Sequence, residues 1–517
     1  MAACVLNTTV TTSEGMYAGT LRDGILSWKG IPYAQPPVGK LRWRPPQNPK
    51  EFSGIRKAEE FGPICPQKGY EPTSIYTIPN LEQSEDCLSL NIWSKRDTLS
   101  HKKAVFVFIH GGRLMREGSS SALYNGHYLA KKDVVFVSIN YRLNVFGFFA
   151  HPQLLKTHPD DYHGNYGLLD QLKALEWIKN NIAVFNGDPE NITLCGESAG
   201  AWSICALMAT DYAAGLFQRV ILQSGAYLWE GPKLLESEKG YSSALEEGEK
   251  FTEILGVQSL NELRQIPQEQ LVNLVFSTEN PLSCEPIIDG KLLKDYLPKQ
   301  FLNTTRVSFD MLIGTNADEW SVFTKDQSPK TYEQFWSGTK DQLPKDYMLL
   351  KSTYLPRYPH DLKSGYDSLH ADLVFNRHAL ELANYAHRTQ NQVYVYYFQQ
   401  GSVNTAYQSL GAYHGAEIPF IFGTLEQESK GHHIDANAWE YADKISNYWV
   451  NFAKSGNPNK ANTNHWKAWH PNQQLCMVFD STMRSCEHPL KKRLKQLAQL
   501  TAQQPTKYRT GLIIKAL

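Results

Sequence analysis

The stretch that decides the fold reads Asn191-Ile192-Thr193-Leu194-Cys195-Gly196-Glu197-Ser198-Ala199-Gly200. A strand-like apolar run leads into Gly-x-Ser-x-Gly, and a helical pattern over 201–209 follows. A serine at such a strand-to-helix turn is typical of a nucleophile elbow, where only small residues fit beside it. The pattern predicts that Ser198 points into a cleft and that the Ala199 amide can donate to an oxyanion. The alternative interpretation is a glycine-rich turn without chemistry.

A second glycine-rich segment lies upstream, where His110-Gly111-Gly112-Arg113 follows the apolar run 104–109. Glycines in such a loop allow the backbone itself to approach a substrate carbonyl. We therefore expect the amides of Gly111, Gly112 and Arg113 to form an oxyanion hole together with that of Ala199.

The other catalytic groups are expected in the chain order serine, acid, histidine. Two adjacent carboxylates, Asp318 and Glu319, follow the run 311–314, and the pattern leaves both open as the acid. His414 lies in a glycine-flanked loop, although nothing local singles it out among 16 histidines. In such a triad the histidine takes the serine proton and returns it to the leaving alcohol, and the acid stabilises the imidazolium.

Short apolar runs alternate with helical patterns along the chain. We expect strands at 104–109, 134–139, 191–195, 220–223, 311–314 and 393–398, and helices at 168–185 and 491–503. This alternation predicts an α/β fold with a large, mostly parallel sheet covered by helices on both faces, preceded by a small antiparallel region. No repeat or linker divides the chain, so we expect one domain over 1–517.

Composition excludes several classes of protein. The 517 residues include 52 Lys+Arg and 52 Asp+Glu, and this neutral balance argues against non-specific nucleic-acid binding. No apolar run approaches the ~18 residues of a membrane span. The expected partners are small-molecule substrates, and the chain is expected to be a monomer or a weak homo-oligomer. No secretory signal is visible, which predicts a cytoplasmic protein unless a signal was trimmed, in which case it is extracytoplasmic.

The cysteines and histidines do not suggest a metal site. Eight cysteines without CxxC spacing are too few for a disulfide scaffold and unsuited to structural zinc. Cys65 and Cys87 flank a loop where a bridge is plausible, and His432-His433 is interpreted as a polar loop. We expect no metal and no cofactor. Glycosylation sequons, meaningful only in a secretory host, occur at Asn7, Asn191 and Asn303.

Together these motifs resemble the type-B carboxylesterase family, which includes cholinesterases, bile-salt lipases and the non-catalytic neuroligins. The resemblance runs through nearly the whole chain. Besides the elbow, it rests on ordered matches at 30–34, 42–46, 84–91, 140–143, 164–171, 222–225 and 451–458. It implies an α/β-hydrolase fold with a deep gorge, Glu319 as the acid and His414 as the base.

The resemblance also implies several supporting contacts. It suggests a Cys65–Cys87 disulfide and a structural Arg44–Glu85 ion pair. It further implies that Ser224 lies near the triad acid and that Glu197 adds negative charge beside His414.

Two features depart from the family pattern. Arg113 stands where the oxyanion loop usually carries glycine or alanine. Its amide can still donate, and its guanidinium would either turn to solvent or favour esters with an anionic group. The loop between the two cysteines contains Tyr70 and Tyr76 but no tryptophan, which cholinesterases use for cation–π binding of choline. Choline esters are therefore not the expected substrates.

The sequence thus predicts a serine carboxylesterase that forms an acyl-enzyme on Ser198 with a Ser-Glu-His triad. Two alternatives remain: a non-catalytic binding protein on the same fold, and a lipase-like member acting on longer acyl chains.

Overall fold

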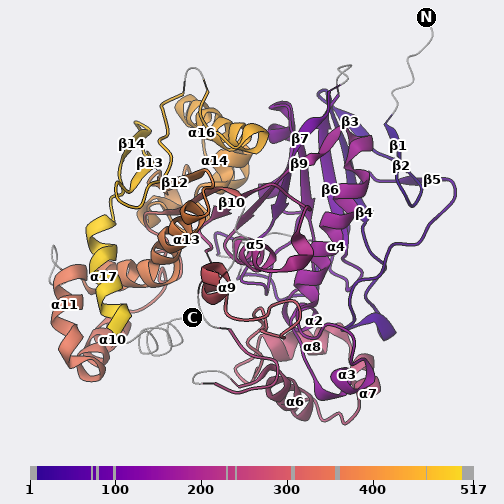
Figure 1. The fold of residues 1–517 in the computed structure, drawn as a ribbon, viewed down its shortest axis with the longest axis horizontal. Helices are drawn as coiled ribbons and strands as arrows, with labels where there is room; N and C mark the ends of the chain where they lie inside the picture. The colour runs from indigo at the N-terminus through magenta and orange to yellow at the C-terminus, as the bar shows by residue number, and fades with distance from the viewer. Residues whose placement is uncertain are drawn as a thin grey trace, which may run out of the picture.

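The computed structural model describes residues 8–503 except 72–73, 77–80, 97–100, 227, 229–230, 239–241, 304–308, 356–360 and 461–462, so Asn7 lies outside the described residues. An 11-stranded sheet runs through the molecule in the order β14-β13-β12-β11-β10-β9-β7-β8-β6-β4-β3. Figure 1 shows the N-terminal strands and the last helix, α17, toward opposite ends of the molecule.

The middle of the sheet is parallel, and its edges are antiparallel. The parallel strands are β8 (Val135–Ile139), β7 (Lys103–Ile109), β9 (Gly187–Glu197), β10 (Arg219–Gln223), β11 (Asp310–Asn316), β12 (Val393–Phe398) and β13 (Leu475–Phe479). The antiparallel edge strands are β14 (Arg484–Glu487), β6 (Ser89–Lys95), β4 (Ile25–Pro32) and β3 (Thr20–Arg22). A separate small sheet joins β1 (Thr9–Thr11), β2 (Met16–Ala18) and β5 (Ile55–Lys57).

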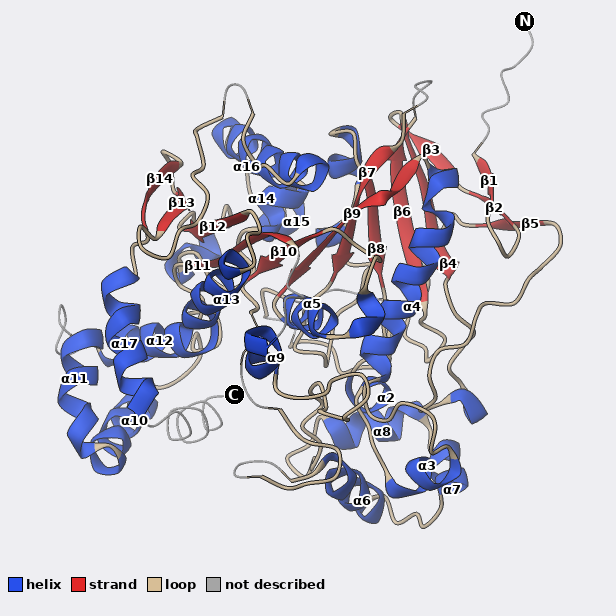
Figure 2. Cartoon of the chain, viewed as in Figure 1, coloured by secondary structure: helices blue, strands red, loops and turns tan. Residues whose placement is uncertain are grey.

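Helices cover both faces of the sheet because alternate side chains of each strand point to opposite sides. In β7, Val105 and Val107 pack into the core that includes α4 (Tyr166–Asn181) and α5 (Ala199–Ala209). Phe106 and Phe108 point to the other core, which includes α14 and α16. Figure 2 shows α4 in front of the red strands.

The remaining helices range from single turns to the long helix α16. They are α1 (His127–Lys131), α2 (Asn144–Gly147), α3 (Pro152–Thr157), α6 (Ala244–Ile254), α7 (Leu260–Gln265), α8 (Gln268–Val275), α9 (Leu297–Asn303), α10 (Pro329–Gln342), α11 (Pro344–Tyr354), α12 (Leu362–Ala371), α13 (Arg377–Arg388), α14 (Ile418–Phe422), α15 (Leu425–Ser429), α16 (Ala436–Ser455) and α17 (Lys491–Gln503). Within the described part of the chain, none of them is long and apolar enough to cross a membrane.

The predicted fold class is confirmed. Each of the six expected strands is present, and 393–398 and 491–503 have the predicted bounds. The helix expected over 168–185 is α4 followed by a 3₁₀ turn, Ile182–Phe185.

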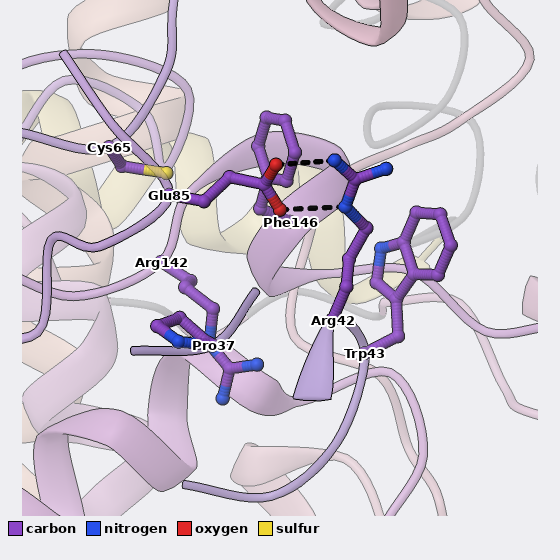
Figure 3. Close-up of a pocket in the computed structure, with 7 residues that line it drawn as sticks. All are labelled: Pro37, Arg42, Trp43, Cys65, Glu85, Arg142 and Phe146. Atoms are coloured by element: carbon purple, nitrogen blue, oxygen red, sulfur yellow. Dashed lines mark hydrogen bonds and ion pairs between the residues drawn. The ribbon is translucent and has the colours of Figure 1, made fainter. Parts of the chain in front are cut away.

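The expected Arg44–Glu85 ion pair is wrong, because Arg42 occupies that place. The Arg42 guanidinium binds both carboxylate oxygens of Glu85, with Nε 2.7 Å from Oε2 (Figure 3). Both side chains are about nine-tenths buried, and Arg42 Nη1 also donates to the carbonyl of Ile266. Arg44 instead pairs with Asp161 at 2.7 Å. The two arginines lie two positions apart, and their different surroundings, not the motif, determine which one reaches Glu85.

The expected Cys65–Cys87 disulfide is also absent, since both cysteines are free, buried thiols. They are nonetheless neighbours: a hydrogen bond with Cys65, together with burial, raises the pKa of the Cys87 thiol. Oxidation of neighbouring thiols to a disulfide depends on the redox compartment as well as on geometry.

The buried Arg42–Glu85 pair generates a stability prediction. Glu85→Gln leaves the Arg42 charge buried without a counter-ion, so we expect unfolding free energy to fall by about 3–5 kcal/mol in urea denaturation. The matched control is Glu440→Gln in the exposed Glu440–Lys444 pair, expected to cost no more than about 0.5 kcal/mol. Equal losses in the two variants would contradict the assignment.

Candidate active site

Ser198 lies at the turn between β9 and α5 in a strained backbone conformation, with φ 53° and ψ −123°. Glycine is required at two positions that pack around this turn. A Cβ on Gly196 would lie 2.5 Å from the Gly200 carbonyl carbon, and one on Gly225 would lie 2.2 Å from the Ser198 carbonyl oxygen. The turn is fixed by a hydrogen bond from the Ser198 amide to the Gln223 carbonyl, 2.9 Å long. Close backbone packing thus holds the serine at the end of the sheet.

The His-Gly-Gly loop packs directly against this turn. A Cβ on Gly200 would lie 2.0 Å from the carbonyl oxygen of Ile109, at the end of β7. A Cβ on Gly111 would lie 2.7 Å from Glu197 Oε2 and 3.1 Å from Ser198 Cβ. The glycines are therefore required for the loop to reach the serine.

Four backbone amides at this junction have no acceptor. Among the described residues, the amides of Gly111, Gly112, Arg113 and Ala199 donate to no protein oxygen. The Ala199 amide also begins α5, where the helix dipole favours negative charge. The structure thus brings together the amides expected to form an oxyanion hole.

Of the two carboxylates that the sequence left open, Glu319 faces the histidine. His414 Nδ1 lies 2.6 Å from Glu319 Oε2, and the Asn316 amide donates to Glu319 Oε1 at 2.8 Å. Glu319 is fully buried. Asp318 turns away and accepts a hydrogen bond from the Ala412 amide, 2.9 Å long.

Glu197 lies on the other side of His414, with its Oε1 3.3 Å from His414 Nε2. Burial lowers the pKa of His414, but the carboxylates Glu197 and Glu319 outweigh it and raise the pKa to about 9. Burial raises the pKa of Glu197, and His414 offsets part of this. The imidazolium of His414 and the carboxylate of Glu197 therefore stabilise each other's charged form.

Ser198 and His414 line one cavity of about 600 Å³, which we call the Ser198 cavity. Its apolar lining includes Leu123, Trp202, Phe276, Val322, Phe375 and Ile418. Its charged lining includes Glu71, Arg113, Arg116, Glu117, Glu197, Lys325 and Asp326. The volume is in the range of small-molecule sites.

Several residues of the site were not identified from the sequence. Glu117 is buried in the cavity wall, where it accepts hydrogen bonds from Tyr70 and Tyr124. Glu417, fully buried, accepts from Asn316 Nδ2 at 2.6 Å and from Gln223 Nε2 at 2.9 Å. Glu417 follows His414 by three positions, and this proximity was the one available signal.

Two aromatic residues support His414. The Tyr76 hydroxyl donates to the His414 carbonyl at 2.6 Å, so the loop between the two cysteines reaches the site. The Phe375 ring lies 4.7 Å from the imidazole, between ring centroids. Phe375 belongs to a π-helical turn, Asp372–Asn376, whose Asp372 is bound by Arg493 of α17.

Ser224, expected near the triad acid, is fully buried beside the elbow. Its amide donates to the Gly314 carbonyl at 2.9 Å, and its hydroxyl has no hydrogen-bond partner in the described structure. In the described part of the chain, no hydrogen bond joins it to Glu319.

Comparison with known proteins gives a consistent result. A family model described as the carboxylesterase family matches residues 5–498. Para-nitrobenzyl esterase of Bacillus subtilis is 34% identical over 94% of this chain and 98% of that protein. Fumonisin B1 esterase of Sphingopyxis macrogoltabida is 32% identical over 92% of this chain and 87% of that protein.

Solved structures of esterases are similar to this chain over nearly its whole length. A PNB esterase and a carboxylesterase of Geobacillus stearothermophilus each superpose with a TM-score of 0.80 at 32% identity. In both cases the match covers 95% of this chain and 99% of the other.

The Glu197–His414 contact generates a pH prediction. If His414 must be neutral to accept a proton, activity falls as pH drops through its pKa. Glu197→Gln removes a negative charge that raises this pKa, so the acidic limb of kcat/KM against pH should move down by roughly one unit or more. The measurement is kcat/KM on a short p-nitrophenyl ester across pH.

The control is Glu190→Gln, on the exposed part of the same strand, which should leave the limb in place. A limb that does not move in Glu197→Gln, or that moves up, would show that Glu197 does not set the protonation of His414.

Proposed function

The chain belongs to the carboxylesterase family and is a carboxylic ester hydrolase, and we propose that it works through a covalent acyl-enzyme on Ser198. The esterase relatives weigh against the non-catalytic alternative. We propose that the chain acts as one catalytic unit, because the groups assigned to the reaction come from β9, the ends of β7 and β11, and the loop that holds His414.

In the first half-reaction, Ser198 Oγ attacks the ester carbonyl carbon while His414 Nε2 takes the hydroxyl proton. Negative charge develops on the carbonyl oxygen and is stabilised by the amides of Gly112, Arg113 and Ala199, with Gly111 beside them. The carbon–oxygen bond of the ester then breaks, and His414 returns the proton to the leaving alcohol. An ester now links the acyl group to Ser198.

In the second half-reaction, water replaces the alcohol. His414 takes a proton from water, whose oxygen attacks the acyl-enzyme carbonyl. The carboxylic acid leaves, and the proton returns to Ser198 Oγ. Throughout, Glu319 fixes the imidazole with its Nδ1 proton toward the carboxylate and stabilises the imidazolium.

The observation that carries this proposal is the 2.6 Å contact between His414 Nδ1 and buried Glu319, in the cavity that Ser198 also lines. That contact orients Nε2, the ring nitrogen that must accept the proton, away from Glu319 and toward the cavity. The strained elbow independently supports Ser198 as the nucleophile.

The relatives and the volume of the cavity bear on the size of the substrate. The names of two relatives, para-nitrobenzyl esterase and fumonisin B1 esterase, indicate that this architecture accepts esters of quite different kinds. A cavity of about 600 Å³ suits small and medium esters. We therefore propose a carboxylesterase rather than a lipase-like enzyme, and a series of p-nitrophenyl esters of increasing acyl length distinguishes the two.

Replacing the nucleophile tests the mechanism. We expect Ser198→Ala to lower kcat on p-nitrophenyl acetate at least about 10⁴-fold, because no acyl-enzyme can form. Stopped-flow measurement should show a burst of nitrophenol in the wild type and none in the variant.

The matched control is Ser352→Ala, at an exposed serine of α11, which should retain full turnover. Substantial turnover by a folded Ser198→Ala variant would refute the acyl-enzyme mechanism and point to direct attack by water.

A further inference from the structure

Arg113 is held in place by its own backbone. It has φ 59° and is followed by Leu114 at φ 60°, a left-handed pair that non-glycine residues rarely adopt. Leu114 is fully buried, and its carbonyl accepts a hydrogen bond from the Asn144 amide, 2.7 Å long. The Met115 carbonyl accepts a second bond from Asn144 Nδ2. This clamp fixes the backbone next to Arg113, an exposed residue that lines the Ser198 cavity.

The guanidinium of Arg113 has no ion-pair or hydrogen-bond partner among the described residues. Other arginines are satisfied by carboxylates, as in the pairs Arg42–Glu85, Arg44–Asp161, Arg142–Asp170 and Arg493–Asp372. Arg116, which lines the same cavity, lies over the rings of Tyr70 and Phe276, 4.9 and 4.8 Å from their centroids. Arg113 is therefore the cation at the oxyanion loop that is free to meet an anion.

The buried carboxylates of the cavity wall, Glu197 and Glu117, already have hydrogen-bond or ion-pair partners. Glu197 faces His414, and Glu117 accepts from two tyrosines. Because His414 must hand its proton to the leaving alcohol, the alcohol part of the substrate has to lie next to these carboxylates. An anionic alcohol beside Glu197 and His414 would be repelled. An anionic acyl group instead meets a charge of opposite sign in the Arg113 guanidinium, which lines the same cavity.

Resting on the acyl-enzyme mechanism above, we propose that Arg113 forms a carboxylate-binding subsite for the acyl group, which makes monoesters of dicarboxylic acids preferred substrates. The guanidinium matches a carboxylate with two parallel N–H donors. One residue then serves the reaction twice: its amide stabilises the oxyanion, and its side chain selects the acyl group.

The test compares two ethyl esters by pH-stat: monoethyl glutarate, whose acyl chain ends in a carboxylate, and ethyl valerate, whose acyl chain of the same length ends in a methyl group. Using the ratio of their kcat/KM values within each variant cancels any change in the oxyanion hole. We expect Arg113→Gln to lower this ratio at least about tenfold, and Arg113→Lys to retain part of it. Salt should lower the wild-type ratio as well. An unchanged ratio in Arg113→Gln would overturn the proposal.

The control is Lys325→Gln, which removes a different cation from the lining of the cavity. An equal fall in this variant would mean that the general field of the cavity, not Arg113, recognises the anion. A fall confined to an ester with its carboxylate on the alcohol, measured as acetoxyacetate against ethyl acetate, would overturn the acyl assignment.

A second measurement does not need the substituted protein. Glutarate should inhibit wild-type hydrolysis of ethyl valerate competitively and more strongly than valerate does, and absence of this difference would contradict the subsite. Failure of the acyl-enzyme mechanism has another signature, since turnover of both esters would then survive Ser198→Ala.

Discussion

The whole site depends on how closely three stretches of backbone approach one another around Ser198. At φ 53° the serine is in a conformation that costs about 1–3 kcal/mol, and only the surrounding sheet and helix maintain it. Gly200 touches the end of β7, so the turn that exposes the serine also determines where the Gly111–Gly112 loop must lie. The proposed nucleophile and the proposed oxyanion donors are thus positioned by one steric constraint, before any side chain contributes.

Buried charges around His414 determine the electrostatics of the rest of the site. One imidazole, His414, lies in a region that holds the carboxylates Glu117, Glu197, Glu319 and Glu417. Such a concentration of buried acids is tolerable because tyrosine, amide and imidazole donors meet them. Burial and the attraction to His414 act in opposite directions on the pKa of Glu197, while the surrounding carboxylates raise the pKa of His414 to about 9.

Features encoded over short distances could be predicted from the sequence, and features that depend on packing could not. The elbow and the strands are local patterns, and the fold class followed from them. Glu319 could not be separated from Asp318 by pattern, because both follow β11, and only the loop around Ala412 shows which one turns to His414. The choice of Arg42 over Arg44 has the same cause. Glu117 was not predicted, because a single acidic residue in a loop has no distinctive sequence pattern. Its hydrogen bonds with two tyrosines exist only in the folded structure.

The contact between Arg493 and Asp372 joins positions 121 residues apart. Asp372 begins the turn that presents Phe375 to His414, and it is completely buried. During synthesis on the ribosome, this carboxylate has no guanidinium to meet until residue 493 has emerged. Until then, the buried turn that lies against His414 lacks the positive charge that α17 supplies.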